Sequence, residues 1–184
     1  MVEPTAVLEP VPAAVEGAVV FTDIVGFTEF TAVQGDAAAN ALLSVQETIV
    51  DQELPNGARV VKELGDGLML WFPEAQTALT TCLSLFERFE RYSQETLQPL
   101  WVRMGLHWGR QTLRRDDLIG HDVNLASRIA DQAGPSELLL SEATLEHLGG
   151  VVNEEQFEEI GPVHLKGIPD PVRLYRALPD WMTD

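Results

Sequence analysis

The sequence has very little cysteine and little positive charge. Its single cysteine, Cys82, excludes an intramolecular disulfide, which is typical of a reducing compartment, and its apolar neighbours indicate a small core residue. The 184 residues contain 12 Lys and Arg against 29 Asp and Glu, a net charge of −17. Because such a surface repels polyanions, the composition argues against nucleic acid or an anionic membrane surface as a partner.

Long hydrophobic runs and a basic start are also missing. No apolar run approaches the roughly 20 residues of a membrane-spanning helix, so we expect no membrane insertion. The segment MVEPTAVLEPVPAAVEG lacks a basic start and is interrupted by prolines, which does not fit a signal peptide, and we expect a cytoplasmic location. We predict a flexible, acidic, proline-rich leader over 1–17 and one domain over 18–184, supported by 45% hydrophobic residues.

Hydrophobic periodicity predicts alternating strands and helices after the leader. Strands are expected at AVVFTDI, LWVRMGLHWG, ELLLS, FEEIGPVHLKG and VRLYRAL, and RVVKELGDGLMLWF predicts a hairpin that turns at Gly65-Asp66-Gly67. Apolar residues at three- and four-residue spacing predict helices over 36–54, over 75–89 and at GHDVNLASRIADQAG. This order predicts an α+β domain with helices packed over a mixed or antiparallel sheet.

Two aspartates stand where predicted strands end. Asp23 closes the apolar run VVFTDI, and a carboxylate there is costly to bury unless something neutralises it. Asp66 lies at the tip of the predicted hairpin. If the first strand lies beside that hairpin, both carboxylates reach one point and can hold hard divalent cations through oxygen. The alternative is that each aspartate only caps a turn, and for Asp66 alone this alternative is favoured.

A second pair of polar residues shares one face of a predicted helix. Asn124 and Arg128 are four residues apart in DLIGHDVNLASRI. An amide and a guanidinium that point the same way suit an anionic ligand, because the guanidinium fork matches phosphate oxygens. The alternative is an ordinary solvated helix face, which is favoured when the pair is considered alone.

Five motifs together resemble a known family. FTDIVGFT, VKELGDG, VRMGLHWG, DLIGHDVNLASRI and HLKG, in this order, resemble the catalytic domain of the class III adenylate and guanylate cyclases, over about residues 18–177. The resemblance implies a ferredoxin-like βαββαβ core with extra strands and helices. It also implies ATP as substrate, two divalent metal ions, Mg²⁺ or Mn²⁺, as cofactors, and a homodimer with shared active sites.

The resemblance implies roles for individual residues. It gives three metal ligands: Asp23, the backbone carbonyl of Ile24, and Asp66. It gives a pair that reads the purine, Lys62 and Asp117. It gives four residues at the sugar and phosphates: Asn124 at the ribose, Arg128 at the reacting phosphate, and Arg103 and Lys166 at the polyphosphate. In the implied dimer the two aspartates that bind metal come from one subunit, and the purine, ribose and reacting-phosphate residues and Lys166 come from the other.

Donor and acceptor chemistry favours ATP over GTP. Lys62 can only donate and ionised Asp117 can only accept, which matches the N1 acceptor and N6 donor of adenine. Guanine presents the reverse edge and leaves both side chains mismatched. Asp116, the neighbouring acid, is the alternative acceptor.

Other features leave competing hypotheses open. Trp108 departs from the small residue that the family usually has at this place, and His107, within a strand pattern, is expected to be structural. A guanylate cyclase is opposed by the Lys62 and Asp117 pair. A nucleotide-binding regulatory module without turnover is opposed by the complete set of candidate residues.

Overall fold

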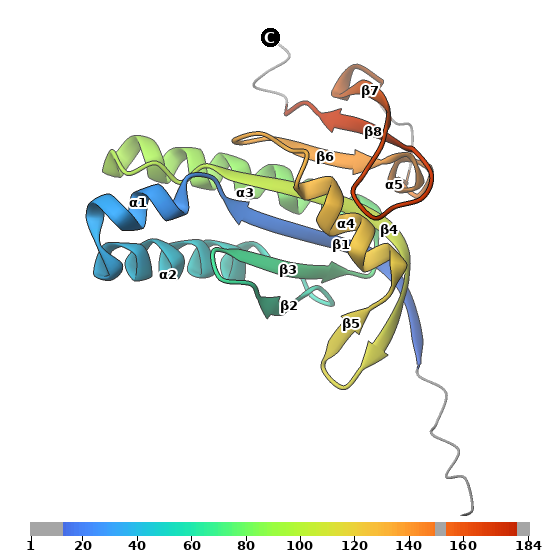
Figure 1. Cartoon of the computed structure of the whole chain (residues 1–184), viewed down its shortest axis with the longest axis horizontal. Helices are drawn as coiled ribbons and strands as arrows, with labels where there is room; N and C mark the ends of the chain where they lie inside the picture. The colour runs from blue at the N-terminus through green and yellow to red at the C-terminus, as the bar shows by residue number, and fades with distance from the viewer. Residues whose placement is uncertain (1–12, 150–153, 180–184) are drawn as a thin grey trace, which may run out of the picture.

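The computed structural model describes residues 13–149 and 154–179. Its centre is an eight-stranded sheet in the order β2-β3-β1-β4-β6-β8-β7, with β5 paired to β4 (Figure 1). The strands are β1 (Ala14–Ile24), β2 (Arg59–Glu63), β3 (Gly67–Phe72), β4 (Val102–Arg114), β5 (Asp117–Ile119), β6 (Leu138–Ser141), β7 (Phe157–Val163) and β8 (Val172–Ala177). The α-helices are α1 (Phe27–Gln34), α2 (Asp36–Glu53), α3 (Ala75–Thr96), α4 (His121–Ala130) and α5 (Glu142–Glu146), and a 3₁₀ turn spans Glu154–Gln156.

The first four strands and two long helices form a ferredoxin-like core. They follow the order β1, α2, β2, β3, α3, β4 along the chain, with α1 inserted before α2. In the sheet β1 lies between β3 and β4 and is antiparallel to both. Strand β6 joins β4 in parallel, and β8 and β7 extend that edge with antiparallel pairings. The predicted α+β class, ferredoxin-like βαββαβ core with extra elements, and mixed sheet are therefore confirmed.

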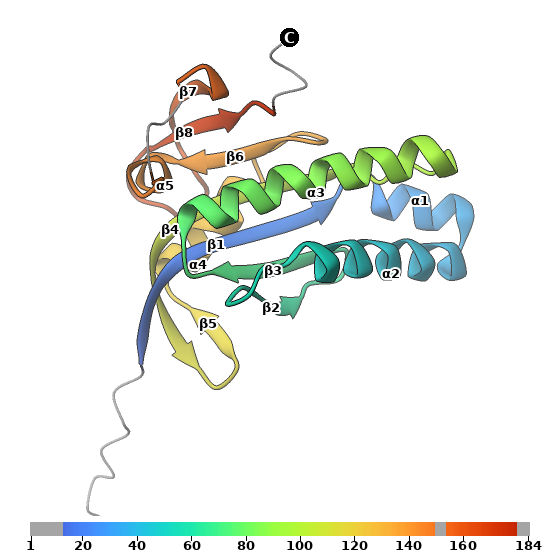
Figure 2. The ribbon, with the colours of Figure 1, turned by 180° about the vertical axis from the view of Figure 1, so that it is seen from behind.

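Helices α2 and α3 cover one face of the sheet and α4 covers the other, as the opposite views in Figure 1 and Figure 2 show. Strand β1 supplies both faces, because successive side chains of a strand point to opposite sides. Val20 packs in the core beneath α2 and α3, whereas Val19 packs with Val123 and Ala126 of α4. The same alternation places Asp23 on the α4 face.

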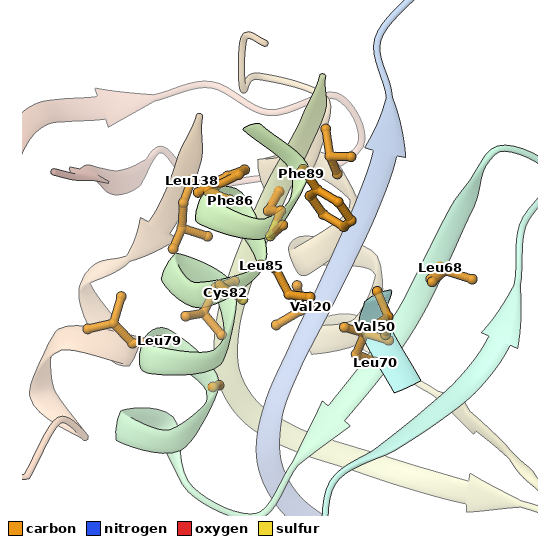
Figure 3. Close-up of a cluster of buried hydrophobic side chains, with 14 of the residues drawn as sticks. Val20, Val50, Leu68, Leu70, Leu79, Cys82, Leu85, Phe86, Phe89 and Leu138 are labelled. Carbon is orange, nitrogen blue, oxygen red and sulfur yellow. The ribbon is translucent and has the colours of Figure 1, made fainter. Parts of the chain in front are cut away.

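Helix α3 supplies one wall of the main core. Its buried apolar residues recur at three- and four-residue spacing, as the sequence predicted. Figure 3 shows them gathered with Val20 of β1 and Leu138 of β6: Leu79, Cys82, Leu85, Phe86 and Phe89. Fully burying a Leu or Phe side chain stabilises a fold by about 1.5–3 kcal/mol, so the packing of α3 on the sheet contributes substantially to stability.

The first strand begins earlier than the sequence predicted. Strand β1 starts at Ala14, within the segment expected to be a leader up to 17, because residues 14–17 continue the antiparallel ladder with the last part of β4. The rest of the predicted leader, 1–12, lies outside the described residues. The division into leader and domain therefore stays a prediction, with its boundary at or before residue 13.

Three short elements were not predicted. Helix α1 buries none of its residues fully, and its partly buried Phe27 and Phe30 are too few to form a periodic pattern. Strand β5 is three residues long and α5 is five, which is too short for a periodic pattern. In the part of the chain that the structure describes, no helix combines the length and hydrophobicity needed to cross a bilayer.

Candidate active site

Asp23 and Asp66 meet where β1 lies beside the β2–β3 hairpin. Asp23 is the penultimate residue of β1, and its register partner on β3 is Gly67. Asp66 precedes Gly67 in the turn, and its backbone oxygen accepts a hydrogen bond from the N–H of Ile24 at 3.2 Å. The expected placement of the first strand beside the hairpin is confirmed, and it brings the two aspartates together.

The close approach of β1 and β3 requires a glycine at position 67. A Cβ built on Gly67 would lie 2.2 Å from the backbone oxygen of Thr22, far inside van der Waals contact. The hydroxyl of Thr22 also ties this region together, because it accepts hydrogen bonds from the N–H of Leu68 at 3.0 Å and from Nε2 of Gln46 on α2 at 3.3 Å. The second glycine of the Gly-Asp-Gly turn therefore serves the packing of the two strands.

The pKa of Asp66 is raised, first by burial and then by the charge of Asp23. Two carboxylates that repel one another form a site that a cation stabilises. Carboxylate oxygens suit Mg²⁺ or Mn²⁺, and Mg²⁺ commonly takes one or two carboxylates together with waters and substrate phosphates. Over 13–149 and 154–179, no cluster of three or more His, Cys, Asp or Glu residues is suited to a metal. The two aspartates thus fit a metal whose coordination is completed by water and substrate oxygens.

Arg103 contacts Asp23 from the neighbouring strand. The two residues are register partners on β4 and β1, so their side chains share the α4 face. Nε of Arg103 donates to Oδ2 of Asp23 at 2.7 Å, and Nη2 lies 2.6 Å from the same oxygen. The sequence suggested Arg103 only as a polyphosphate ligand, whereas the structure also shows it as the partner that neutralises Asp23.

Lys62 and Asp117 form the second charged pair of the site. Nζ of Lys62 on β2 donates to Oδ2 of Asp117 on β5 at 2.8 Å, and Oδ1 of Asp117 accepts from the N–H of Leu118. The Lys62 hydrogen bond is the main cause that lowers the pKa of Asp117. Asp116, the alternative acceptor, is exposed in the turn, and its backbone oxygen accepts from Arg59. In this chain Lys62 therefore contacts Asp117.

Helix α4 presents Asn124 above the same face of the sheet. The helix lies directly on β4 at Gly105, where a Cβ would be 2.2 Å from the backbone nitrogen of Ala130. Asn124 is exposed on this helix and lines a pocket of about 350 Å³. Asp23, Lys62 and Arg103 line the same pocket, so residues from β1, β2, β4 and α4 converge on one cavity.

Five predicted site residues do not line this pocket in a single chain: Ile24, Asp66, Asp117, Arg128 and Lys166. The first three adjoin residues that do line it, because Ile24 follows Asp23, Asp66 precedes Gly67 and Asp117 contacts Lys62. Arg128 is also on α4, but its Nη1 donates to Oδ2 of Asp131 at 2.9 Å. Lys166 is exposed in the turn between β7 and β8. Neither residue lines the cavity that contains Asp23.

The two aromatic residues that sequence analysis set apart belong to the packing around α5. Trp108 packs partly against the main core and stacks on His147, with ring centroids 4.9 Å apart. His107 is buried and contacts Ser141 and Asp122.

Sequence reasoning missed two aspartates near the site. Asp131 lines the pocket and binds Arg128, and its position three residues after that arginine on a helix was the available signal. Asp122 lies in the first turn of α4, and its Oδ2 accepts a hydrogen bond from the N–H of Arg110 at 2.6 Å. That contact depends on a crossing of helix and strand that the sequence alone does not reveal.

Comparison with curated proteins identifies related enzymes. The chain is 29% identical over 171 residues to the pH-sensitive adenylate cyclase MT1302 of Mycobacterium tuberculosis, which covers 92% of this chain and 42% of that protein. It is 36% identical over 132 residues to an adenylate cyclase of Streptomyces coelicolor, 71% of this chain and 34% of the relative. The chain therefore spans less than half the length of these relatives.

Solved structures and a family model agree with these relatives. The adenylyl cyclase CyaB from P. aeruginosa matches with a TM-score of 0.82 at 25% identity, over 92% of this chain and 96% of that chain. The guanylyl cyclase Cya2 shares the fold, with a TM-score of 0.72 at 20% identity over 90% of this chain and 93% of that chain. A family model described as the adenylate and guanylate cyclase catalytic domain matches residues 12–177. The chain therefore belongs to the adenylate and guanylate cyclase catalytic domain family, the class III nucleotidyl cyclases.

Proposed function

We propose that this chain is an adenylate cyclase, which converts ATP into 3′,5′-cyclic AMP and pyrophosphate. The observation that carries the choice of ATP is the contact between Lys62 and Asp117. Lys62 retains N–H donors for N1 of adenine, and Asp117, whose pKa is lowered mainly by its hydrogen bond with Lys62, retains lone pairs for the N6 amino group. Guanine would meet an acceptor with an acceptor and a donor with a donor, so GTP is the poorer substrate.

In the proposed reaction the ribose 3′ oxygen attacks the α-phosphorus. The new bond joins this oxygen to phosphorus, the bond to the bridging oxygen of the β-phosphate breaks, and pyrophosphate leaves while the hydroxyl proton passes to solvent. Asn124 orients the ribose, and Arg128 meets the negative charge that grows on the reacting phosphate. Arg103 and Lys166 hold the polyphosphate through charge-assisted hydrogen bonds.

Asp23, Asp66 and the backbone carbonyl of Ile24 are the proposed ligands of two divalent metal ions, Mg²⁺ or Mn²⁺. The raised pKa of Asp66 beside Asp23 supports this assignment. When bound, the metals stabilise charge on the attacking and leaving oxygens. We also propose a cytoplasmic location, supported by the single, buried thiol of Cys82.

The primary test is incubation with ATP or GTP and Mg²⁺ or Mn²⁺, followed by chromatographic identification of the product. We expect cyclic AMP, and we expect Asp23→Asn and Asp66→Asn to reduce its formation on the order of 10³-fold, the scale of several kcal/mol of transition-state stabilisation. Asp51→Asn, at an exposed position of α2, is the matched control and should retain activity. Nucleotide binding without any product would instead favour the regulatory module, and cyclic GMP as the main product would favour guanylate cyclase.

Purine selectivity has its own test. Lys62→Glu combined with Asp117→Ser replaces the donor by an acceptor and removes the original acceptor, so the ratio of kcat/KM for ATP to that for GTP should fall by about 10-fold or more. Asp116→Ser, at the exposed neighbour, is the control. If the control lowers the ratio and the double variant does not, the base is read through Asp116.

We propose a homodimer in which each active site is shared between two chains. Membership of the class III cyclase family supports this arrangement. Arg128 and Lys166 do not line the pocket of Asp23 in one chain, so a second chain can supply them, whereas Lys62 and Asn124 line that pocket within the same chain. The test mixes two inactive proteins, Asp23→Ala with Asp66→Ala and Asn124→Ala with Arg128→Ala. A mixed dimer then contains one complete site, and activity should return. Heterodimers that form and stay inactive would show that each chain builds its own site.

A further inference from the structure

A buried histidine connects helix α4 to the sheet outside the proposed set of substrate ligands. His107 on β4 is 5% exposed. Its Nε2 lies 3.5 Å from Oδ1 of Asp122 in the first turn of α4. Its Nδ1 lies 2.7 Å from the hydroxyl of Ser141, the residue that caps the N-terminus of α5. One imidazole therefore joins β4, the end of β6 and the start of α4.

This contact lies between two glycines of β4, where α4 packs directly against the strand backbone. A Cβ built on Gly109 would lie 2.2 Å from Oδ2 of Asp122, and one built on Gly105 would lie 2.2 Å from the backbone nitrogen of Ala130. The two glycines let both ends of α4 approach β4, and they flank His107 along the same face of the strand. Within this strip the side chain of His107 contacts the helix at Asp122, which lies two residues before Asn124.

The groups around His107 can form hydrogen bonds with either of its protonation states. The hydroxyl of Thr144 donates to the backbone oxygen of Leu106 and lies 3.1 Å from that of Ser141. With neutral His107, Ser141 donates its single proton to Nδ1. With protonated His107, Nδ1–H donates to Ser141, which turns its proton toward Thr144. Neither state leaves a buried donor or acceptor without a partner.

Protonation changes the strength of the contact with Asp122. Asp122 is the ionisable group that faces His107 from α4, while β6 and α5 present the hydroxyls of Ser141 and Thr144 and β1 presents Val19. The contact with His107, at 3.5 Å, is the main cause that lowers the pKa of Asp122, and nearby His121 acts in the same direction. A charged imidazole facing an ionised carboxylate makes a shorter and stronger hydrogen bond than a neutral one.

We propose that His107 is a positioning residue for the cyclase reaction, which through Asp122 fixes the start of α4 and thereby the placement of Asn124 and Arg128. Proton uptake at His107 tightens this contact, so the helix is held best when the imidazole is charged. The inference rests on the proposed adenylate cyclase function for its kinetic consequence, but its structural consequence can be measured independently. His107 itself exchanges no proton with the substrate.

The kinetic test compares pH profiles of kcat between about pH 5.5 and 8.5, the range in which an imidazole titrates. His107→Gln retains an N–H donor but cannot become charged, and Asp122→Asn retains an acceptor for the N–H of Arg110 without its charge. At the acidic end we expect either variant to have a kcat lower than wild type on the order of 10-fold, with little change in KM. The difference should disappear at the alkaline end. His147→Gln, at the exposed histidine stacked on Trp108, is the matched control and should follow wild type.

The structural test uses NMR on the metal-free protein and needs no turnover. In wild type, the backbone amide shifts of Asn124 and Arg128 should follow the same titration curve as the His107 imidazole. In Asp122→Asn this shared titration should be lost while the far-UV circular dichroism is retained. Amides of α4 that ignore the titration of His107 in wild type would overturn the proposal, even if the enzyme is active. An inactive protein in which the shared titration is seen would overturn the cyclase function and leave the helix coupling intact.

Discussion

Replacing Gly105 with alanine should lift helix α4 away from the sheet. The added Cβ would lie 2.2 Å from the backbone nitrogen of Ala130, 2.6 Å from its Cα and 2.7 Å from the backbone oxygen of Ala126. Ordinary contact begins at 3.4 Å, so the nearest atom is more than an ångström too close. All three atoms belong to the helix backbone, and no side-chain rotation can relieve the clash. The helix or the strand must move by about 1 Å.

Two measurements follow from that displacement. Overpacking of this kind costs about 1–3 kcal/mol of unfolding free energy, and each kcal/mol lowers Tm by about 2–4 °C in a chain of this size. Because α4 carries Asn124 and Arg128, a displacement of about 1 Å should also reduce kcat by about 100-fold. Urea unfolding and a cyclic AMP assay measure the two effects.

The control for this prediction is Gly134→Ala, just beyond the end of α4. A Cβ at Gly134 would lie 3.4 Å from the nearest atom, Oε2 of Glu137, which is ordinary contact. This variant should match wild type in stability and in kcat. If Gly105→Ala also matches wild type in both measurements, α4 does not depend on its close seat on β4, and the reasoning is refuted.

Three further predictions concern stability and reactivity. The pKa of Asp66 is raised above the ordinary value of 3.8, so its stabilising contribution is present below that value and is lost as pH rises through the raised pKa. In metal-free buffer Asp66→Asn should therefore have a higher Tm than wild type at neutral pH and lose this advantage in acid; a constant difference would contradict the sign. Burial raises the pKa of Cys82 to about 12, so a thiol reagent should label it only in denaturant, and rapid labelling of the native protein would show that α3 opens. Phe89 is 1% exposed, and Phe89→Ala should reduce the unfolding free energy by about 3–5 kcal/mol in urea titration, whereas a loss below about 1 kcal/mol would place it outside the core.

The long amphipathic helices and apolar strands could be predicted because their periodicity is local. Helix α2 follows its expected range closely, α3 starts where expected but continues to Thr96 beyond the expected end at 89, and the expected hairpin turns at Asp66. Helix α1 was not predicted because it is short and its core-facing Phe27 and Phe30 are only partly buried. The start of β1 was also missed, because residues 14–17 are ordered by pairing with β4, almost a hundred positions away, and a short acidic segment gives no sign of that partner.

The contacts of the candidate site also differ in whether a local sequence pattern predicts them. The proximity of Asp23 and Asp66 followed from placing one strand beside one hairpin, a step that sequence pattern supports. The contact of Asp23 with Arg103 depends on the register between two strands, and a slip of one residue would have put the guanidinium on the opposite face. The pairing of His107 with Asp122 depends on how closely α4 approaches β4. Gly105 and Gly109 permit this approach, but glycines in a sequence do not predict it.

If Asp23 binds a metal ion as proposed, the ion pair between Arg103 and Asp23 would make metal binding an exchange of cations. The guanidinium already neutralises the carboxylate, so an arriving divalent ion competes with a tethered charge. Such an exchange would release the guanidinium of Arg103, which lines the pocket, to bind a phosphate group there. A free metal ion leaves the released arginine without an anion, whereas a metal ion that arrives already chelated by a nucleotide brings its own phosphates. The domain should therefore bind the metal–nucleotide complex more tightly than its separate affinities for the metal ion and for the nucleotide would give.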